Sequence, residues 1–146
     1  MSHIVEKKSE ITNLDYVQRA CERLGLTYQY DAVPRYYYTA SGGQEAMRCA
    51  MVIRLPGKYD LGLKRSADGS YAYVCDGELL SGSYGLRDAG RQLLGDNAAL
   101  LMQGYNECKV EEMLMQSGIS FTRSVDADGV VLYETADPVA QGLVQG

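Results

Sequence analysis

The first clear pattern along the chain is an apolar residue at every third or fourth position between residues 14 and 24. This spacing predicts an amphipathic helix with one buried stripe. The stripe consists of Leu14, Val17, Cys21 and Leu24. Thr12 and Asp15 have the spacing of a capping box at its start, and Gly25 is well placed to end it in a left-handed conformation. The pattern therefore predicts a helix over residues 14–24.

After Gly25 the apolar period changes to two residues, which is typical of a strand with one buried face. "LTYQY" and "VPRYYYTA" are the first such segments, after an extended start from His3 to Ile11. The alternation is clearest in three later segments, which are Met47–Arg54, Lys58–Lys64 and Tyr71–Cys75. In the first of these, Met47, Cys49, Met51 and Ile53 share a face, and Arg48, Ala50, Val52 and Arg54 share the other.

An Asp-Gly turn, "SADGS", joins the second and third of these segments and predicts an antiparallel hairpin. In the second segment Tyr59 is expected to point inward, and Asp60 is expected to point outward. Tyr71, Tyr73 and Cys75 share one face of the returning strand. Alternation thus accounts for most of the polar side chains crowded between residues 58 and 76.

The C-terminal third repeats the change from a helical period to a strand period. Apolar residues predict a helix over Ala98–Ser117 with Asn97 as its cap, and Val110, Met113 and Leu114 continue its apolar surface. "ISFTRSV" and "VVLYE" are expected to form two strands joined by the turn "DADG". Residues 77–97 hold five glycines and predict only a short helix near Leu86–Leu94.

Together these elements predict an α+β fold with two layers, in which helices pack on one face of a mainly antiparallel sheet. A chain of 146 residues with 46% hydrophobic content has the usual size of one domain. We expect a single α+β domain over residues 1–135 and a C-terminal tail over residues 136–146, because chain ends are commonly frayed.

The acidic composition of the chain disfavours nucleic acid and anionic membranes as binding partners. The formal net charge is −5 and the sequence pI is about 4.8, whereas capture of nucleic acid or of an anionic membrane requires a basic surface. No apolar run approaches the roughly 20 residues that span a bilayer, and "MSHIVEKKSE" carries charges where a signal peptide is apolar. These features predict a soluble, intracellular, cytoplasmic protein that binds neither nucleic acid nor membrane.

The four cysteines, Cys21, Cys49, Cys75 and Cys108, are widely separated, and the chain holds only one histidine. Zinc sites need closely spaced Cys and His ligands, so this set favours buried, reduced thiols over a metal site. We expect Cys21 and Cys49 to be buried because each lies on the apolar stripe of its element. No cofactor and no metal is predicted.

The sequence contains no complete catalytic constellation. His3 is the only imidazole available to activate a nucleophile, and no GxxxxGK[ST] loop is present to cradle phosphate. Asp60 and Asp76 lie on adjacent predicted strands, where paired carboxylates can share a proton or bind a cation. Two function classes stay open: a noncatalytic adaptor, and a small-ligand or metal-dependent enzyme with a site near His3, Asp60 and Asp76. Solvated surface carboxylates are the commoner arrangement.

Several short segments of the chain resemble, in order and spacing, the segments of a known protein family. They are "MSH", "LGL", "MVIR", "YDLGL", "GSYAYVCD", "QGYNECKVEEMLMQSGISF" and "DADGVVLYE". In these segments the chain resembles the plastid and cyanobacterial family known as hypothetical chloroplast open reading frame thirty-five, a domain of unknown function also found in other bacteria. The resemblance covers most of residues 1–135. The chain departs from it in "YYYTASGGQEA", in the glycine-rich stretch before Asn97 and after Glu134.

The resemblance implies a shared fold, and it implies no catalytic residues because that family has no established activity. Genes of such proteins can lie near genes for AAA-type ATPases, which implies an ATPase partner by association only. For a plastid-encoded chain the resemblance implies the plastid stroma.

From the residues themselves we expect an accessory or adaptor protein that binds another protein and has no turnover of its own. One face of the predicted sheet carries charges able to orient a partner. These residues are Arg48, Arg54, Lys58, Asp60 and Lys64.

Overall fold

The computed structural model describes residues 4–35, 48–57, 59–81 and 89–135. The chain divides into two compact units, Met1–Asn106 and Glu107–Gly146, and each is described by itself. The single domain predicted for residues 1–135 stays a prediction.

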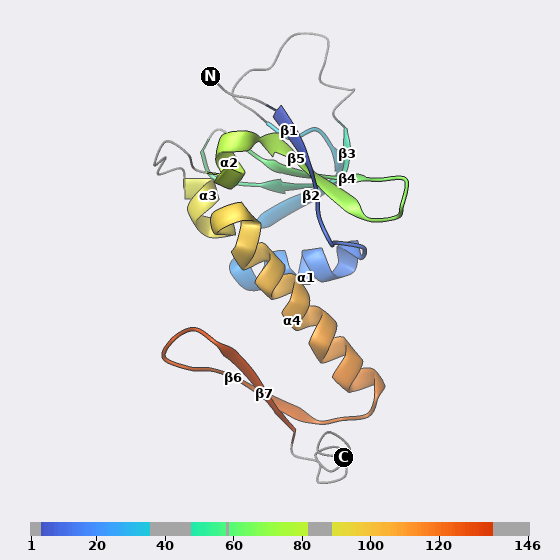
Figure 1. Cartoon of the computed structure of the whole chain (residues 1–146), viewed down its shortest axis with the longest axis vertical. Helices are drawn as coiled ribbons and strands as arrows, with labels where there is room; N and C mark the ends of the chain where they lie inside the picture. Colours follow the sequence, from blue (N-terminus) through green and yellow to red (C-terminus); the bar gives the residue numbers. More distant parts are fainter. Residues whose placement is uncertain (1–3, 36–47, 58, 82–88, 136–146) are drawn as a thin grey trace. The chain divides into compact units, whose positions relative to one another are not determined.

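The first unit is built on a five-stranded antiparallel sheet (Figure 1). Its strands are β1 (Ile4–Lys8), β2 (Thr27–Ala32), β3 (Cys49–Arg54), β4 (Leu61–Arg65) and β5 (Tyr71–Asp76), in the order β1-β5-β4-β3-β2. The sequence prediction of an α+β fold with a mainly antiparallel sheet is confirmed. β4 begins at Leu61, three residues later than predicted, and Lys58 and most of "VPRYYYTA" lie outside the described residues.

Five helical segments accompany the strands in the described residues. They are α1 (Leu14–Leu24), α2 (Gly77–Ser81), α3 (Ala89–Leu94), the 3-10 helix η2 (Asp96–Ala98) and α4 (Ala99–Gln116). The cap of α1 is Asn13, whose side chain accepts a hydrogen bond from the backbone N–H of Asp15, so the predicted Thr12 cap is wrong. Gly25 ends α1 with φ 73°, the predicted left-handed conformation.

The main hydrophobic core of this unit contains side chains from the strands and from the helices. It contains alternate strand residues, among them Met51 and Ile53 of β3, Leu61 and Leu63 of β4, and Tyr73 and Cys75 of β5. Val17, Ala20 and Cys21 of α1, Leu79 and Leu80 of α2, and Leu101 and Tyr105 of α4 belong to the same cluster. Burial of this apolar surface is the dominant favourable contribution to folding. That the helices pack on one face of the sheet stays a prediction.

A second, smaller cluster consists of Ala32, Cys49, Val52 and Val74. Cys49 therefore packs with Val52 and Val74, and the expectation that it shares a face with Met51 and Ile53 is wrong. Gly62 lies beside this cluster, where an added Cβ would come within 2.6 Å of the Cys49 sulfur and 3.0 Å of the Val74 carbonyl oxygen. A glycine is needed at this strand position because the neighbouring atoms leave no room for a side chain.

Tyr105 of α4 is bonded to the start of α1. Its hydroxyl accepts hydrogen bonds from the backbone N–H groups of Thr12 and Asn13, at 3.1 and 3.2 Å. Its ring meets the Tyr16 ring edge to face, with centroids 5.6 Å apart. Both N–H groups come directly before the first turn of α1, so this hydroxyl fixes where the chain enters the helix.

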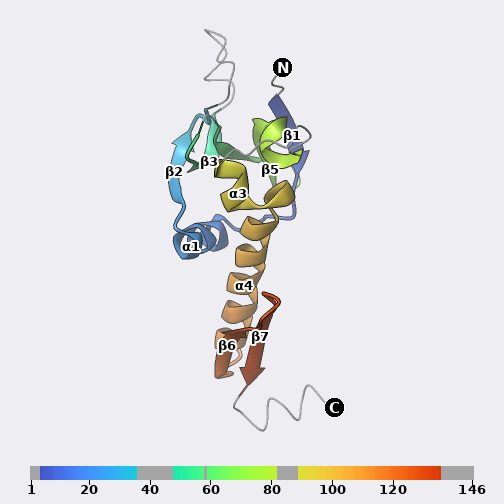
Figure 2. The same ribbon diagram turned by 90° about the vertical axis from the view of Figure 1, so that its left-hand side faces the viewer.

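The second unit holds the end of α4 and a two-stranded hairpin of β6 (Phe121–Val125) and β7 (Val131–Thr135) (Figure 2). Both strands, their Asp-Gly turn and the preceding helix were predicted from the sequence and are confirmed. Gly129 has φ 83° in the turn, and the Asp126 carboxylate accepts hydrogen bonds from the backbone N–H groups of Asp128 and Val130. The hairpin register places Ser124 opposite Leu132 and Thr122 opposite Glu134.

Candidate functional site

Asp60 is a fully buried carboxylate that precedes β4. The Arg35 guanidinium donates to its two oxygens at 3.0 and 2.9 Å, and the Arg54 guanidinium donates at 2.7 Å. The backbone N–H groups of Arg35 and Leu55 donate two more hydrogen bonds, at 2.8 and 3.1 Å. The carboxylate therefore connects the segment before β4 to the segment at Arg35 and to the end of β3 at Arg54 and Leu55.

Two opposing influences act on the pKa of Asp60. Burial raises the pKa, because it disfavours the charged form, but the hydrogen bonds from Arg35, Arg54 and Leu55 outweigh burial and hold the pKa below its ordinary value. The same contact with Asp60 raises the pKa of Arg35. Asp60 is thus an ionised structural group with five hydrogen bonds, an arrangement that suits neither proton transfer nor the binding of a cation.

This geometry corrects the predicted orientation of both carboxylates. Asp60 is buried, not outward, because it precedes β4 and because two arginines compensate its charge. Asp76 is also fully buried, at the end of β5 opposite Ile4, so it is not a solvated surface carboxylate. His3, the third residue of the alternative site, lies outside the described residues.

The predicted partner-binding residues are not all available to a partner. The side chain of Arg54 is 29% exposed and is bonded to Asp60, which is itself buried. Arg48 is more exposed and donates a hydrogen bond to the backbone carbonyl of Asp31 at 2.9 Å, and Lys64 is half-buried. Lys58 lies outside the described residues. A partner-binding role for Arg48 and Lys64 stays a prediction.

All four cysteines are buried free thiols, as was predicted for Cys21 and Cys49. Burial raises the pKa of Cys21 and of Cys75 to about 12 and that of Cys49 to about 11. A thiol reacts as its thiolate, so these sulfurs are protected both by their low accessibility and by their protonation. Nucleophilic chemistry at these cysteines is disfavoured.

The second unit has its own polar contacts between α4 and the hairpin. Arg123 of β6 donates a hydrogen bond to the Glu107 carboxylate at 3.0 Å, and Tyr133 of β7 donates one to Glu111 at 2.8 Å. Desolvation and this contact with Glu111 raise the pKa of Tyr133 to about 12. The Phe121 and Tyr133 rings also meet edge to face, 5.6 Å apart. One face of the hairpin, carrying Arg123 and Tyr133, is therefore turned toward α4.

Residues 107–135 nevertheless expose six large apolar side chains, called here the apolar set. They are Val110 (40%), Met113 (60%), Met115 (61%), Val125 (52%), Val130 (52%) and Leu132 (43%). In the same stretch only Glu107 and Cys108 are buried. A two-stranded hairpin is marginally stable by itself, and exposed apolar groups are available for burial against a partner.

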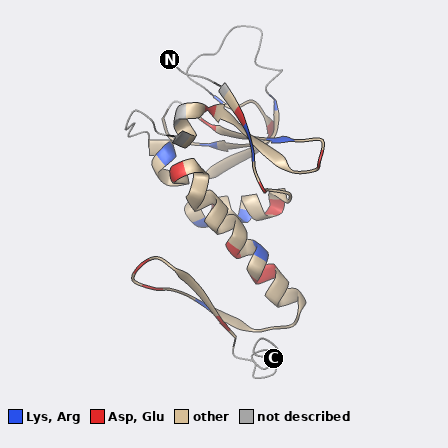
Figure 3. Cartoon of the chain, in the orientation of Figure 1, with Lys and Arg blue, Asp and Glu red and all other residues tan. Residues whose placement is uncertain are grey.

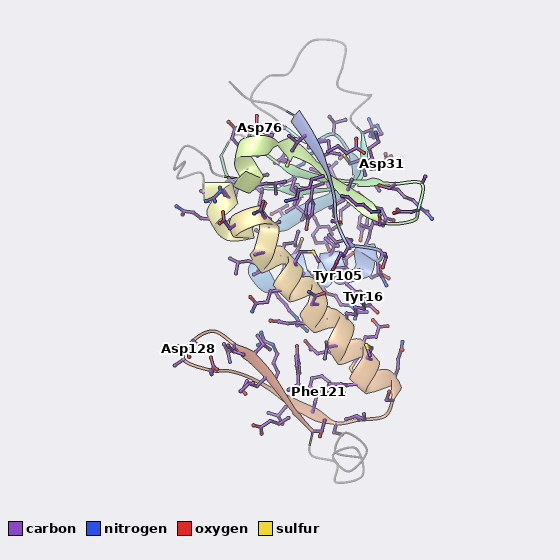
Figure 4. The ribbon with its side chains drawn as sticks, in the orientation of Figure 1. Tyr16, Asp31, Asp76, Tyr105, Phe121 and Asp128 are labelled. Atoms are coloured by element: carbon purple, nitrogen blue, oxygen red, sulfur yellow. The ribbon has the colours of Figure 1, made fainter. Side chains whose placement is uncertain are left out.

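The stretch that carries the apolar set is also rich in acidic residues, whose positions along the ribbon are red in Figure 3. Residues 107–135 contain six acidic and two basic residues, a formal net charge of −4 out of −5 for the whole chain. Figure 4 shows Asp128 at the tip of the hairpin and Phe121 at its base. The sequence placed Val110 and Met113 on the apolar surface of the helix, but it did not predict that they are exposed. It did not reveal the hairpin part, because alternating Val and Leu residues are equally typical of a strand that is covered.

Comparison with known proteins finds no protein-family model, curated protein or solved structure that matches the chain. In the part of the chain that the structure describes, no group of three or more His, Cys, Asp or Glu side chains is arranged to hold a metal ion. Among those same residues, no helix has both the length and the apolar character needed to cross a membrane.

Proposed function

We propose that this protein is a noncatalytic adaptor that binds another protein through residues 107–135. The main support for the proposal is the exposure of the apolar set. These residues belong to a stretch of 29 residues in which only two side chains are buried. Binding a partner would bury these groups, and burying a half-exposed Leu or Met contributes about 1 kcal/mol each. Met113 and Met115 suit such a surface because unbranched thioether side chains adapt to a partner's shape.

The class of partner is proposed from the resemblance. The resemblance to the plastid and cyanobacterial family favours an AAA-type ATPase as one partner to test. The alternative enzyme site near His3, Asp60 and Asp76 is less favoured, since the hydrogen bonds of Asp60 already occupy both carboxylate oxygens.

The test compares two sets of exposed apolar residues in the full chain. One variant carries Val110→Ser, Met113→Ser and Leu132→Ser in the second unit. The matched control carries Leu93→Ser and Leu100→Ser, which are 40% and 43% exposed in the first unit. Each tagged protein is used for affinity capture from its native host, followed by mass spectrometry. Circular dichroism first confirms that both variants are folded.

We expect a protein that is captured by the wild-type chain and by the control, and lost from the triple variant. Equal capture by the control and the triple variant would show that residues 107–135 are not the binding surface. Capture of no protein by the wild-type chain would also contradict the proposal.

A further inference from the structure

The outer side of β7 has a regular pattern. Val130, Leu132 and Glu134 alternate along the chain, so they share one side of the hairpin, away from Tyr133. Two of these residues are exposed apolar groups and the third is an exposed acid. Their counterparts on β6 are small and polar, with Ser124 opposite Leu132 and Thr122 opposite Glu134.

The charge near this side of the hairpin is of one sign. Asp126 and Asp128 lie in the turn, and Glu134 lies toward the other end of β7. Of the two basic residues in residues 107–135, Arg123 is bonded to Glu107 on the opposite face of the hairpin and Lys109 lies on α4. A partner that covers this side of the hairpin therefore meets carboxylates at both ends of an apolar centre.

Within the residues that the structure describes, β7 is paired with β6 alone. The far side of such a strand presents backbone N–H and C=O groups to an added strand. Strand addition draws affinity from these backbone groups and specificity from alternate side chains. Cross-strand pairs of opposite charge, and pairs of apolar side chains, stabilise the pairing.

We infer that the edge of β7 that faces away from β6 binds an extended, basic segment of a protein partner as a third strand. The partner places apolar side chains opposite Val130 and Leu132 and a Lys or Arg opposite Glu134. This inference rests on the proposed function and specifies how residues 107–135 recognise the partner. A second copy of this chain is a poorer occupant, because joining two acidic hairpins brings like charges together.

The test measures binding of a synthetic peptide to the full-length protein by fluorescence anisotropy. The probe is about eight residues long, the length of an ordinary strand, and alternates Val or Thr with Lys. Two control peptides have the same length: one replaces each Lys with Glu, and the other keeps the same charge but is a strong helix former. The variants are Leu132→Lys and Glu134→Lys on β7, with Thr122→Lys on β6 as the matched control.

We expect the basic extended peptide to bind, and both control peptides to bind much more weakly. Each β7 variant weakens binding by about fivefold, the ratio that corresponds to the loss of one good cross-strand pair. Thr122→Lys adds the same charge to the same hairpin but not to the β7 edge, so it should weaken binding less. Amide chemical shifts confirm that each variant keeps its fold, and they place the peptide beside β7.

The inference would be overturned by no binding of the basic extended peptide, by equal binding of either control peptide, or by equal loss in Thr122→Lys and Leu132→Lys. A dimer in analytical ultracentrifugation that is lost in the β7 variants would also contradict the inference, because the occupant of the β7 edge would then be a second copy of the chain. If the peptide fails while capture of the native partner still depends on the apolar set, the inference fails and the proposed function stands. Capture that is independent of the apolar set contradicts the proposed function itself.

Discussion

The carboxylate of Asp60 and the guanidinium of Arg54 lie 2.7 Å apart, with no part of the Asp60 side chain exposed to solvent. Arg35 completes the group from a third segment of the chain. Removing one partner of a buried ion pair is costly because the remaining charge keeps its desolvation penalty without its compensation. The contact therefore contributes to the cohesion of the first unit.

Asp60→Asn should destabilise the folded protein by about 3 kcal/mol, because the amide NH2 group faces arginine donors that it cannot satisfy. Urea unfolding followed by circular dichroism measures the change in the free energy of unfolding. The matched control is Asp31→Asn, since Asp31 pairs with Arg48 at 3.5 Å but is 82% exposed. An exposed pair is expected to change stability by about 0.5 kcal/mol or less. Equal effects of the two variants would contradict the structural role of Asp60.

The contribution of Asp60 should also depend on pH. The pKa of Asp60 is lowered in the folded protein, so its contribution is fully present above the unfolded pKa of about 3.9. It is lost as the pH falls through the folded pKa, since the unfolded chain then binds the proton more readily. The stability difference between wild type and Asp60→Asn should stay constant from about pH 7 to about pH 5 and should narrow as the pH falls below about 4. Urea titrations at each pH measure it, and a difference that does not narrow would show that the pKa of Asp60 is not lowered.

Tyr105→Phe should destabilise the start of α1. The variant removes the hydroxyl that accepts from the Thr12 and Asn13 N–H groups, and losing such part-buried hydrogen bonds costs about 1 kcal/mol. Hydrogen exchange of these two amides should accelerate. The control is Tyr30→Phe, because the Tyr30 hydroxyl donates an exposed hydrogen bond to the Gln18 side chain. Unchanged exchange in Tyr105→Phe would show that this hydroxyl does not hold the helix start.

Several helices and strands could be predicted from the sequence because an element with one buried face has apolar residues at a regular spacing. Leu14–Leu24 is a helix, and β3 and β5 fall within a residue or two of the predicted strands. The hairpin turn at Asp126 was predictable for the same local reason, since Asp and Gly favour its backbone angles.

Features that depend on contacts distant in sequence could not be predicted in this way. Asp60 looks like a surface residue of an alternating strand, and its burial depends on Arg54 and on Arg35, which is 25 positions away. The face of Cys49 was misassigned because Val74 is brought beside it by sheet pairing, which local alternation does not specify. The exposure of Leu132 was missed for a related reason, because an alternating pattern does not tell whether anything covers the strand.

The thiols provide a test of the buried clusters. Because burial raises the pKa values of Cys21, Cys49 and Cys75 and shields the sulfurs, labelling with a disulfide reagent should be slow in the native protein. Labelling should become rapid in urea. Mass spectrometry of the labelled peptides identifies each site. Rapid labelling of Cys21 or Cys49 without urea would contradict the packing of the two clusters.

Methionine oxidation tests the exposed surface of residues 107–135. Met113 and Met115 are 60% and 61% exposed, whereas Met51 is fully buried in the main core. Dilute peroxide converts an accessible thioether to its sulfoxide, and access controls the rate. We therefore expect Met113 and Met115 to be oxidised well before Met51, as measured by mass spectrometry of proteolytic fragments. Unfolding in urea should remove the difference, because all three thioethers then become accessible.

The same measurement connects exposure to binding. A partner that covers the apolar set should slow the oxidation of Met113 and Met115 while leaving the folded protein intact. The control is a chain carrying Val110→Ser and Leu132→Ser, which keeps both methionines but weakens the apolar contact, so protection by the partner should be reduced. Equal oxidation rates of Met113 and Met51 in the free protein would show that the apolar set is already covered. Unprotected methionines in a saturated complex would place the partner on another surface.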